Sequence, residues 1–535
     1  MNFETIDIVI FVGYCLLILC VGFFVSKDKK GHQKNAEDYF LASKSLPWWA
    51  VGASLIAANI SAEQFIGMSG AGFASGLAIA SYEWMAAITL IIVGKYFLPI
   101  FIKKEIYTIP EFVEKRFSTE LKTILAIFWI ALFIFVNLAS VLYLGGLALE
   151  GIMGVPLEYG ILGLAVFAAA YSLYGGLSAV AWTDVIQVFF LVLGGLFTTY
   201  LALDVLSDGQ GWISGFQKLL DAAPDRFHMI LDESNPEYKN LPGIWVLVGG
   251  LWVANLYYWG FNQYIIQRTL AAKSLKEAQK GIAMAAFLKL LIPFIVVIPG
   301  IAAYVMVNDP EIIARLSEQS VMNIPSKSDQ AYPWLLQLLP AGMKGIAVAA
   351  LTAAIVSSLA SMLNSTSTIF TMDIYKTYIN KQAGDKKTVQ VGRLSAGVAL
   401  LLGAIVAPVL GSIDQAFHYI QEYTGVVSPG ILAIFVLGLF WKKATNKGAI
   451  AGAISSIPIA LGLKFFTELP WMHQMGLTAL LTMGVIIVIS LSQGKGEDDE
   501  KGISLGGGLF KTTTSFNISA FAVCIICAVL YALFW

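Results

Sequence analysis

The stretch Ala53-Ser-Leu-Ile-Ala-Ala-Asn-Ile-Ser-Ala-Glu-Gln-Phe-Ile-Gly-Met-Ser-Gly-Ala-Gly72 combines a membrane-like composition with polar side chains at its centre. It is long and apolar enough to enter a bilayer, yet Asn59, Ser61, Glu63 and Gln64 interrupt it and glycines follow. Placing such a cluster on a lipid-facing helix costs free energy, because the bilayer core has no water to hydrogen-bond with polar groups. We therefore predict a helix that breaks to line a polar cavity. The alternative is a polar helix face packed against neighbouring helices.

The composition of the chain places this stretch in an all-α polytopic membrane protein. Of its 535 residues, 57% are hydrophobic and only 13% are charged, against roughly 25% charged residues in a soluble protein. The net charge of −1 gives no sign of a nucleic-acid partner. The four cysteines fall in the first and last apolar runs, so they indicate neither a disulfide framework nor a zinc site.

The apolar runs predict fourteen transmembrane helices, since a span needs about 20 apolar residues. The seventh contains glycines that flank polar and aromatic residues, as the second does. The expected spans are 7–25, 47–75, 82–102, 123–150, 158–175, 183–203, 243–266, 280–305, 335–374, 391–410, 416–440, 447–465, 475–493 and 517–535.

The distribution of lysine and arginine orients these spans. Most of the 34 basic residues fall in the connections that lie on one side if both termini are outside the cell, as the positive-inside rule requires. The two long connections, 204–242 and 306–334, then lie outside, with the protein in the plasma (inner) membrane. No interior connection is long enough for a soluble domain, which argues against a receptor or a kinase-type signalling protein.

The second and seventh spans each open a set of five. Because five is odd, spans 2–6 and 7–11 have opposite orientations, and an interrupted helix begins each set. This pattern is typical of an inverted-repeat secondary transporter with its site at the bilayer midplane.

Polar residues in these spans offer the groups that a sugar needs. A sugar hydroxyl both donates and accepts hydrogen bonds, so its site mixes amide, carboxylate and ammonium groups with aromatic faces. An amino-acid site would instead aim helix N-termini at a carboxylate. The alternative for most of these residues is pairing in helix packing, and for Lys289 it is reaching the interface. The candidates are Gln64, Glu83, Asn255, Lys289 and Gln421, with Tyr82, Tyr258 and Trp259 as aromatic faces.

A second set of oxygens lies in the ninth span. Ser357 and Ser358 offer hydroxyls that a broken helix can face, and a hard cation prefers such oxygen ligands. No carboxylate in this patch calls for a divalent ion, so we predict a monovalent cation. Asp184, which opens the sixth span, either adds charge nearby or caps its helix. The four histidines form no metal-binding motif and no phosphate loop is present, so we expect no enzyme.

Three stretches resemble the solute:sodium symporter family, and within it the bacterial sodium/galactose cotransporters. They are Ala57-Ala-Asn-Ile-Ser-Ala-Glu-Gln-Phe-Ile-Gly67, Trp252-Val-Ala-Asn-Leu-Tyr-Tyr-Trp-Gly-Phe-Asn-Gln-Tyr-Ile-Ile-Gln-Arg268 and Ile355-Val-Ser-Ser-Leu-Ala-Ser-Met-Leu-Asn-Ser365. The resemblance implies a LeuT-type core of two five-helix repeats, with one helix before it and three after. The expected units are residues 1–46, with the extra helix and a cytoplasmic loop; the first repeat, 47–203; the external connection, 204–242; the second repeat, 243–440; and the peripheral helices, 441–535.

The resemblance also implies roles for individual residues. It makes Gln64, Glu83, Asn255, Lys289 and Gln421 sugar hydrogen-bonding residues. It makes Tyr258, with Trp259, the inner closure, linked to the broken helix by Asn59, and it makes Met68, Tyr82 and Phe417 the outer cover. It gives sodium the carbonyls of Ala57, Ile60 and Ala354 and the hydroxyls of Ser357 and Ser358, with Asp184 near the sodium exit.

Two positions depart from the galactose-type pattern, and one acidic residue has no role in it. Phe133 stands where a tyrosine is expected and Ala86 where a serine is expected, and each change removes a hydroxyl near the presumed sugar. Glu63 is left without an assignment. We expect a sodium-coupled symporter for galactose or glucose in the lipid bilayer, with sodium and the sugar as its partners and no obligatory protein partner. The alternatives are another organic solute, such as sialic acid, inositol or proline, and a transporter-like sugar sensor.

Overall fold

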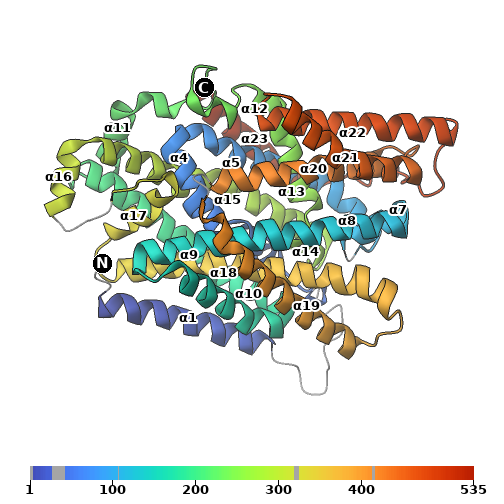
Figure 1. Ribbon diagram of the computed structural model, residues 1–535, viewed down its shortest axis with the longest axis horizontal. Coiled ribbons are helices and arrows are strands. Elements are labelled where there is room, and N and C mark those ends of the chain that lie inside the picture. Colours follow the sequence, from blue (N-terminus) through green and yellow to red (C-terminus); the bar gives the residue numbers. More distant parts are fainter. Residues whose placement is uncertain (1–3, 27–41, 107, 319–323, 413–415) are drawn as a thin grey trace.

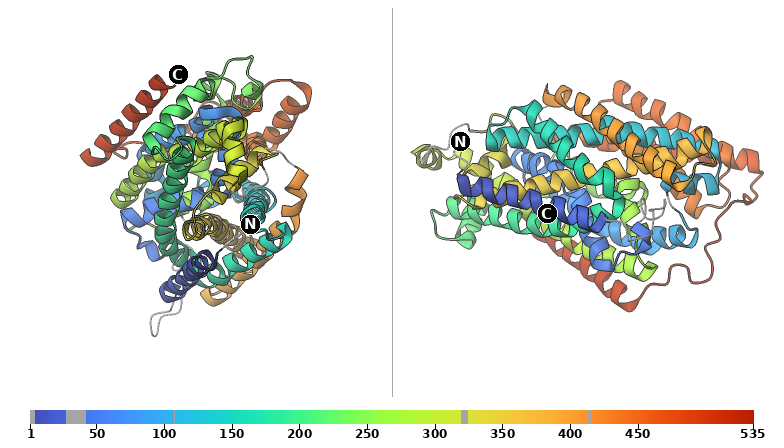
Figure 2. Two further views of the ribbon diagram at one scale, coloured as in Figure 1. Left: turned by 90° about the vertical axis from the view of Figure 1, so that its left-hand side faces the viewer. Right: turned by 90° about the horizontal axis from the view of Figure 1, so that it is seen from below.

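The computed structural model describes residues 4–26, 42–106, 108–318, 324–412 and 416–535 (Figure 1). The described chain is helical throughout, and its one β-bridge joins Leu46 to Ala272. Most long helices run side by side along the longest axis of the molecule, and the end-on view of Figure 2 looks down several of them.

The first half of the chain runs from the N-terminal helix to the long external connection. Its helices are α1 (Thr5–Ser26), α3 (Trp48–Asn59), the π-helix η2 (Glu63–Met68), α4 (Ser69–Ser75), η3 (Gly76–Ala80), α5 (Ser81–Ile92), η4 (Val93–Phe97), α6 (Leu98–Lys103), α7 (Ile109–Arg116), α8 (Thr119–Leu132), η5 (Phe133–Leu138), α9 (Ala139–Met153), α10 (Leu157–Leu206) and α11 (Trp212–Ala222).

The second half has a similar alternation of long and interrupted helices. It comprises α12 (Trp245–Val248), α13 (Gly250–Phe261), α14 (Gln263–Leu270), α15 (Leu275–Asn308), α16 (Pro310–Glu318), α17 (Ala331–Gln337), α18 (Met343–Ile369), η9 (Phe370–Ile379), α19 (Asp385–Val406), α20 (Ala416–Phe440), α21 (Asn446–Phe466), α22 (Trp471–Gly494) and α23 (Thr514–Leu533). Short 3-10 turns lie at Ala42–Lys44, Pro224–Phe227, Pro236–Lys239, Ser328–Gln330 and Ala407–Ser412.

The predicted break in the opening stretch is confirmed. Helix α3 ends at Asn59, Ile60 has extended backbone (φ −78°, ψ 106°), and helical structure resumes before Glu63. The polar side chains replace the missing helical hydrogen bonds: Ser61 N–H donates to Gln64 Oε1 (3.0 Å), and Glu63 N–H donates to Ser61 Oγ (3.0 Å). Because a buried backbone group must find a partner, the polar residues are what allow the chain to break inside the bundle.

The seventh predicted span is interrupted as well. Helix α13 ends at Phe261, Asn262 has extended backbone (φ −88°, ψ 120°), and α14 begins at Gln263. A second irregularity at Gly249 separates α13 from the short α12.

The structure contains eleven helices that are long and apolar enough to cross a membrane among the described residues, against fourteen predicted spans. The three missing segments are the two interrupted spans and the fifth, whose apolar helix Leu157–Ala170 is short. Helical bonding continues from there through α10, but α10 is not straight. Leu164 and Ile355 both meet Gly145, while Asp184 accepts a hydrogen bond from Ser357. A straight helix would separate residues 164 and 184 by about 30 Å, so α10 bends between them.

The C-terminus contacts one of the connections that were predicted to be external, and the N-terminal helix contacts the segment that follows the other. Asp7 of α1 accepts hydrogen bonds from the N–H groups of Gly342 and Gly345 (2.8 Å each), which follow the 306–334 connection. At the other terminus, Phe534 accepts a hydrogen bond from Met229 N–H of the 204–242 connection (2.7 Å). In Figure 1, α11, α16 and the N-terminus gather at one end of the molecule, and α7 lies at the opposite end.

Close packing holds the outer half of the broken helix against α15. A Cβ atom on Gly72 would lie 2.9 Å from Val297 O, and one on Gly300 would lie 2.1 Å from Ser69 O. Small residues let membrane helices approach in this way, and the approach fixes α4 beside the helix that carries Lys289.

Candidate functional site: a polar cavity at the broken helix

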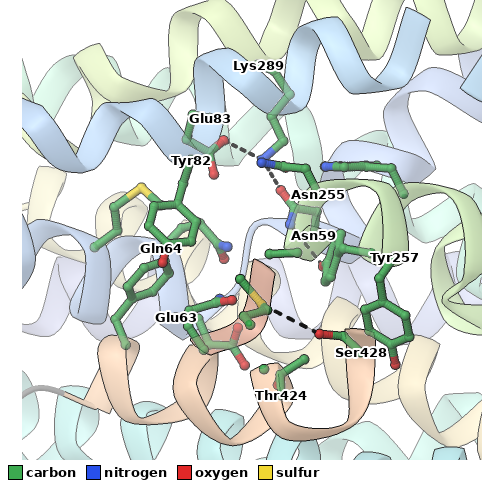
Figure 3. Close-up of a pocket in the computed structure, with 18 residues that line it drawn as sticks. Asn59, Glu63, Gln64, Tyr82, Glu83, Asn255, Tyr257, Lys289, Thr424 and Ser428 are labelled. Atoms are coloured by element: carbon green, nitrogen blue, oxygen red, sulfur yellow. Dashed lines mark hydrogen bonds and ion pairs between the residues drawn. The ribbon is translucent and has the colours of Figure 1, made fainter. Parts of the chain in front are cut away.

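A buried cavity of about 50 Å³ lies beside the break and is bounded by η2, α5, α13, α15 and α20 (Figure 3). This is room for a few water molecules. The structure brings all eleven predicted sugar and gate residues to this one cavity, from segments far apart in the chain. They are Asn59, Gln64, Met68, Tyr82, Glu83, Asn255, Tyr258, Trp259, Lys289, Phe417 and Gln421.

One polar network links three helices across the cavity. Lys289 of α15, which is 1% exposed, donates to Glu83 Oε2 of α5 and to Asn59 Oδ1 of α3 in short hydrogen bonds. Its ammonium also lies 5.1 Å from the centre of the Trp259 ring. A buried ammonium needs both a counter-charge and acceptors, and this site supplies them. Lys289 is therefore a cavity residue rather than a lysine that reaches the membrane interface.

The network continues from Asn59 to the aromatic residues of the broken seventh span. Asn59 Nδ2 donates to Tyr258 Oη (2.9 Å), and Tyr264 Oη donates to Tyr258 Oη (2.7 Å). The predicted contact between Asn59 and Tyr258 is present in the structure. One asparagine thus connects the break in the second span to the lysine–glutamate pair and to the ring of Tyr258.

The amide side chains of the cavity have groups left to bind a ligand. Gln64 uses its carbonyl oxygen for Ser61, which leaves its NH₂ group as a donor. Asn255 donates to Leu251 O (3.2 Å), which leaves its side-chain oxygen as an acceptor. Together with the carboxylates and the ammonium, they give the cavity the mixture of donors and acceptors that polyhydroxylated molecules require.

Aromatic rings cover the cavity on two sides. Tyr82 and Phe417 meet edge to face at 5.1 Å, with Met68 beside them in the lining. Tyr258 and Trp259 meet at 5.2 Å on the α13 side. A Cβ atom on Gly67 would lie 3.0 Å from Phe417 Cβ, so η2 and α20 already touch at this cover.

The predicted sodium ligands are all buried, and two of them, Ser357 and Ser358, belong to a second polar cluster where α3, α10 and α18 meet. Ala57, Ile60, Ala354, Ser357 and Ser358 are each 0% exposed. The Ser358 hydroxyl donates to Ala58 O (3.1 Å) in the last turn of α3, so α18 is tied to the chain just before the break.

Asp184 is part of this cluster. Its two carboxylate oxygens accept hydrogen bonds from Ser357 and from Ser54 of α3 (2.5 Å each), and Arg268 Nη2 lies 3.9 Å away. Hydroxyl and carbonyl oxygens of this kind suit a hard monovalent cation. Of the two sequence interpretations of Asp184, the additional charge describes its contacts better than a helix cap, because α10 continues through it.

Comparison with known proteins assigns the chain to a family. A model of the sodium:solute symporter family matches residues 39–456. This chain is a sodium:solute symporter.

The symporter is similar to characterised sugar and polyol transporters. It is 68% identical to a sodium/glucose cotransporter of Vibrio parahaemolyticus over 535 residues, which cover 99% of this chain and 98% of that protein. It is 34% identical to the human sodium/myo-inositol cotransporter 2 over 475 residues, which cover 86% of this chain and 69% of that protein.

Solved structures share its architecture. The substrate-bound, outward-open structure of a Na⁺-coupled sialic acid symporter has a TM-score of 0.79 and 25% identity, with 91% of this chain and 98% of that chain covered. A closed nucleobase-cation-symport-1 family transporter has a TM-score of 0.50 and 15% identity, over 91% and 99% of the two chains, which supports a common fold alone. Sodium is the coupling ion of the family, and here it is cargo rather than a resident cofactor.

Sequence reasoning missed several lining residues of the symporter cavity. Hydroxyl and thioether groups on membrane helices are most often packing residues, and these gave no separate signal in the sequence. Conversely, Phe133 and Ala86 do not line the cavity, and the Phe133 ring packs on Tyr264 at 5.5 Å. Glu63, which the sequence showed as a polar interruption without an assigned role, also lines the cavity. The lining residues that gave no signal are Ala254, Tyr257, Thr424, Gly425, Ser428 and Met475.

Proposed function

We propose that this symporter imports a hexose, glucose or galactose, driven by the inward movement of sodium. The observation that carries the proposal is the convergence of amides, two carboxylates and an ammonium on one cavity that aromatic rings cover. Five of these groups are proposed to bind sugar hydroxyls: Gln64, Glu83, Asn255, Lys289 and Gln421. The 68% identity to a sodium/glucose cotransporter supports the same substrate class.

The proposed sodium site joins the broken helix to the ninth span. Its ligands would be the carbonyls of Ala57, Ile60 and Ala354 and the hydroxyls of Ser357 and Ser358. The hydrogen bond from Ser358 to Ala58 supports this position, because the hydroxyl already faces the backbone at the end of α3. Sodium bound there would hold α3 against α18 and keep Asn59 and Gln64 in place for the sugar. Asp184, bonded to Ser357, would attract sodium as it leaves.

Transport would proceed by alternating access between two five-helix repeats, residues 47–203 and 243–440, within a fold of fourteen spans. Helix 1–46 and the three helices of 441–535 would lie outside this core. Met68, Tyr82 and Phe417 would close the sugar from the outside, and Tyr258 with Trp259 from the inside. The contact of Asn59 with Tyr258 gives sodium release a route to the inner closure, because loosening α3 would withdraw the hydrogen bond that holds the Tyr258 ring.

The proposed topology places both termini outside and the protein in the plasma (inner) membrane. The contact of Phe534 with Met229 supports one side for the C-terminus and the 204–242 connection, and the contact of Asp7 with Gly342 supports one side for the N-terminus and the start of α18. One uncompensated sodium per cycle would make transport electrogenic, and the membrane potential would contribute about 2.3 kcal/mol per charge per 100 mV.

The test is uptake into proteoliposomes that contain the purified symporter. Labelled glucose and galactose should enter with an inward sodium gradient and not with potassium in its place. Unlabelled myo-inositol, sialic acid and proline, added in turn as competitors, should inhibit less than glucose does. Stronger inhibition by one of them would replace the sugar as substrate, and binding without uptake would indicate a sensor.

A further inference from the structure

Glu63 is the one carboxylate that lines the sugar cavity without a described counter-ion. It is the first residue of η2 after the break and is 6% exposed. Its N–H donates to Ser61 Oγ (3.0 Å), which fixes the backbone, but its Oε1 atom has no hydrogen-bond partner among the described residues. The side chain lies beside Thr424, across the cavity from Lys289 (Figure 3).

The neighbouring carboxylate shows what such a group normally requires. Glu83 is equally buried, at 3% exposure, but pairs with Lys289. Lys289 is thus occupied at the far side of the cavity and does not reach Glu63 in the described contacts. A buried carboxylate without donors is costly unless a ligand supplies them, so Glu63 marks a place where the empty cavity is incomplete.

The chemical groups that line the cavity beside Glu63 favour a ligand with hydroxyl groups over a cation. The residues that line this wall with Glu63 are Thr424, Gly425 and Ser428 of α20 and Met475 of α22. They add two hydroxyls and a thioether to one carboxylate, and the described residues contain no group of three or more His, Cys, Asp or Glu side chains that could hold a metal ion. A carboxylate has acceptor sites on both oxygens, so two adjacent hydroxyls of one molecule can donate to it together. Hydrogen bonds to a charged acceptor are also roughly twice as strong as neutral ones.

We propose that Glu63 accepts hydrogen bonds from adjacent hydroxyl groups of the transported sugar and so discriminates among sugars by the position of those hydroxyls. The proposal rests on the proposed function and adds a specificity-determining residue to it. The bound sugar lies between two acidic side chains. Glu83 is paired with Lys289, whereas Glu63 has only the hydroxyl groups of the sugar as hydrogen-bond donors. A sugar with adjacent hydroxyls at this end satisfies Glu63, whereas a sugar that lacks one of them leaves a Glu63 oxygen without a donor.

The substitution Glu63→Gln tests this because it keeps the size and removes the charge. We expect the glucose concentration for half-maximal uptake at saturating sodium to rise at least tenfold. The sodium concentration for half-maximal uptake at saturating glucose should stay within twofold of wild type. The matched control is Glu158→Gln, an exposed glutamate at the start of α10, which should change neither value.

A series of monodeoxyglucoses locates the hydroxyls. Wild type should bind one or two members of the series at least tenfold more weakly than glucose, and for those members Glu63→Gln should cause no further loss. Equal affinities for all sugars in Glu63→Gln and wild type, or an equal loss across the whole series, would overturn the role of Glu63.

Two further results keep the test decisive. If Glu63→Gln yields no folded protein, Glu63→Asp, which keeps the charge and shortens the reach, is put through the same series, and an unchanged deoxy-sugar profile would overturn the proposal. A wild-type protein with no sodium-dependent sugar uptake would refute the proposed function itself. Normal wild-type uptake together with an unaffected Glu63→Gln would refute only the inference about Glu63.

Discussion

Removing the Lys289 ammonium should destabilise the fold through the partner that it leaves behind. Lys289 and Glu83 are 1% and 3% exposed, and no other described cation pairs with Glu83. Lys289→Met, which keeps the length and loses the charge, leaves a buried carboxylate without its counter-charge. Breaking a buried ion pair in this way costs about 3–5 kcal/mol. The lost hydrogen bond to Asn59 adds about 1 kcal/mol.

Removing both charges together should restore most of that stability. The double variant Glu83→Gln/Lys289→Met leaves no unpaired charge, so we expect its stability to lie within about 1–2 kcal/mol of wild type. Sugar uptake should be lost in the single and the double variant alike, because both remove groups proposed to bind the sugar.

Thermal unfolding of the purified proteins in detergent measures the first effect, and proteoliposome uptake measures the second. The expected order of melting temperatures is wild type, then the double variant slightly below it, then Lys289→Met several degrees lower. A double variant less stable than Lys289→Met would refute the reasoning that the uncompensated Glu83 charge causes the loss. Normal uptake by the double variant would remove both residues from the proposed sugar site.

Three other perturbations follow from separate contacts. Ser358→Ala removes a hydroxyl proposed to bind sodium. In uptake titrations, the sodium concentration for half-maximal uptake should rise severalfold, while the sugar affinity at saturating sodium should stay unchanged. A loss of sugar affinity with unchanged sodium dependence would show that sodium binds at another site. Asp7→Asn weakens the acceptor that holds the first N–H groups of α18; melting should show a loss of about 1–3 kcal/mol with sugar affinity unchanged, and an unaltered melting temperature would contradict this role. Burial alone raises the pKa of Glu114 on α7, but hydrogen bonds from Lys122 and Thr119 outweigh it and leave the pKa below 4.5. The folded state thus favours the charged carboxylate. The stability that Glu114 contributes is therefore present above its pKa in the unfolded chain and is lost as the pH falls through its lower pKa in the folded protein. Glu114→Gln should make the melting temperature depend less on pH in this acidic range, and an unchanged dependence would show that the pair with Lys122 does not contribute to stability.

The break in the second span was predictable because its cause is local. Polar residues that replace backbone hydrogen bonds must lie within a few residues of the break, and Ser61 and Gln64 do so.

The number of predicted spans is harder to compare with the number of long helices in the structure, because a span that contains a broken helix has no single continuous apolar helix. The second and seventh spans are each divided, and the fifth and sixth spans share the one bent helix α10. Fourteen spans therefore remains a prediction, since eleven long apolar helices are what continuous length alone detects among the described residues.

The charged and amide residues of the cavity were predictable from the sequence, but the hydroxyl residues that α20 contributes to its wall were not. An ionisable residue such as Lys289 stands out in an apolar run because its burial is costly. Thr424 and Ser428 do not stand out, because hydroxyl groups bond to the carbonyls of their own helices without penalty. Only the packing of α20 beside η2 shows that they share a cavity with Glu63.

Accumulation of sugar against its own gradient tests the central claim, sodium-coupled hexose transport, most directly. Proteoliposomes are loaded with the same concentration of labelled glucose inside and outside, and a sodium gradient directed inward is then imposed. The account predicts that internal glucose rises above the external concentration and returns to it when the sodium gradient is dissipated with an ionophore. Internal and external glucose that stay equal throughout, with exchange intact, would show facilitated diffusion and contradict the account.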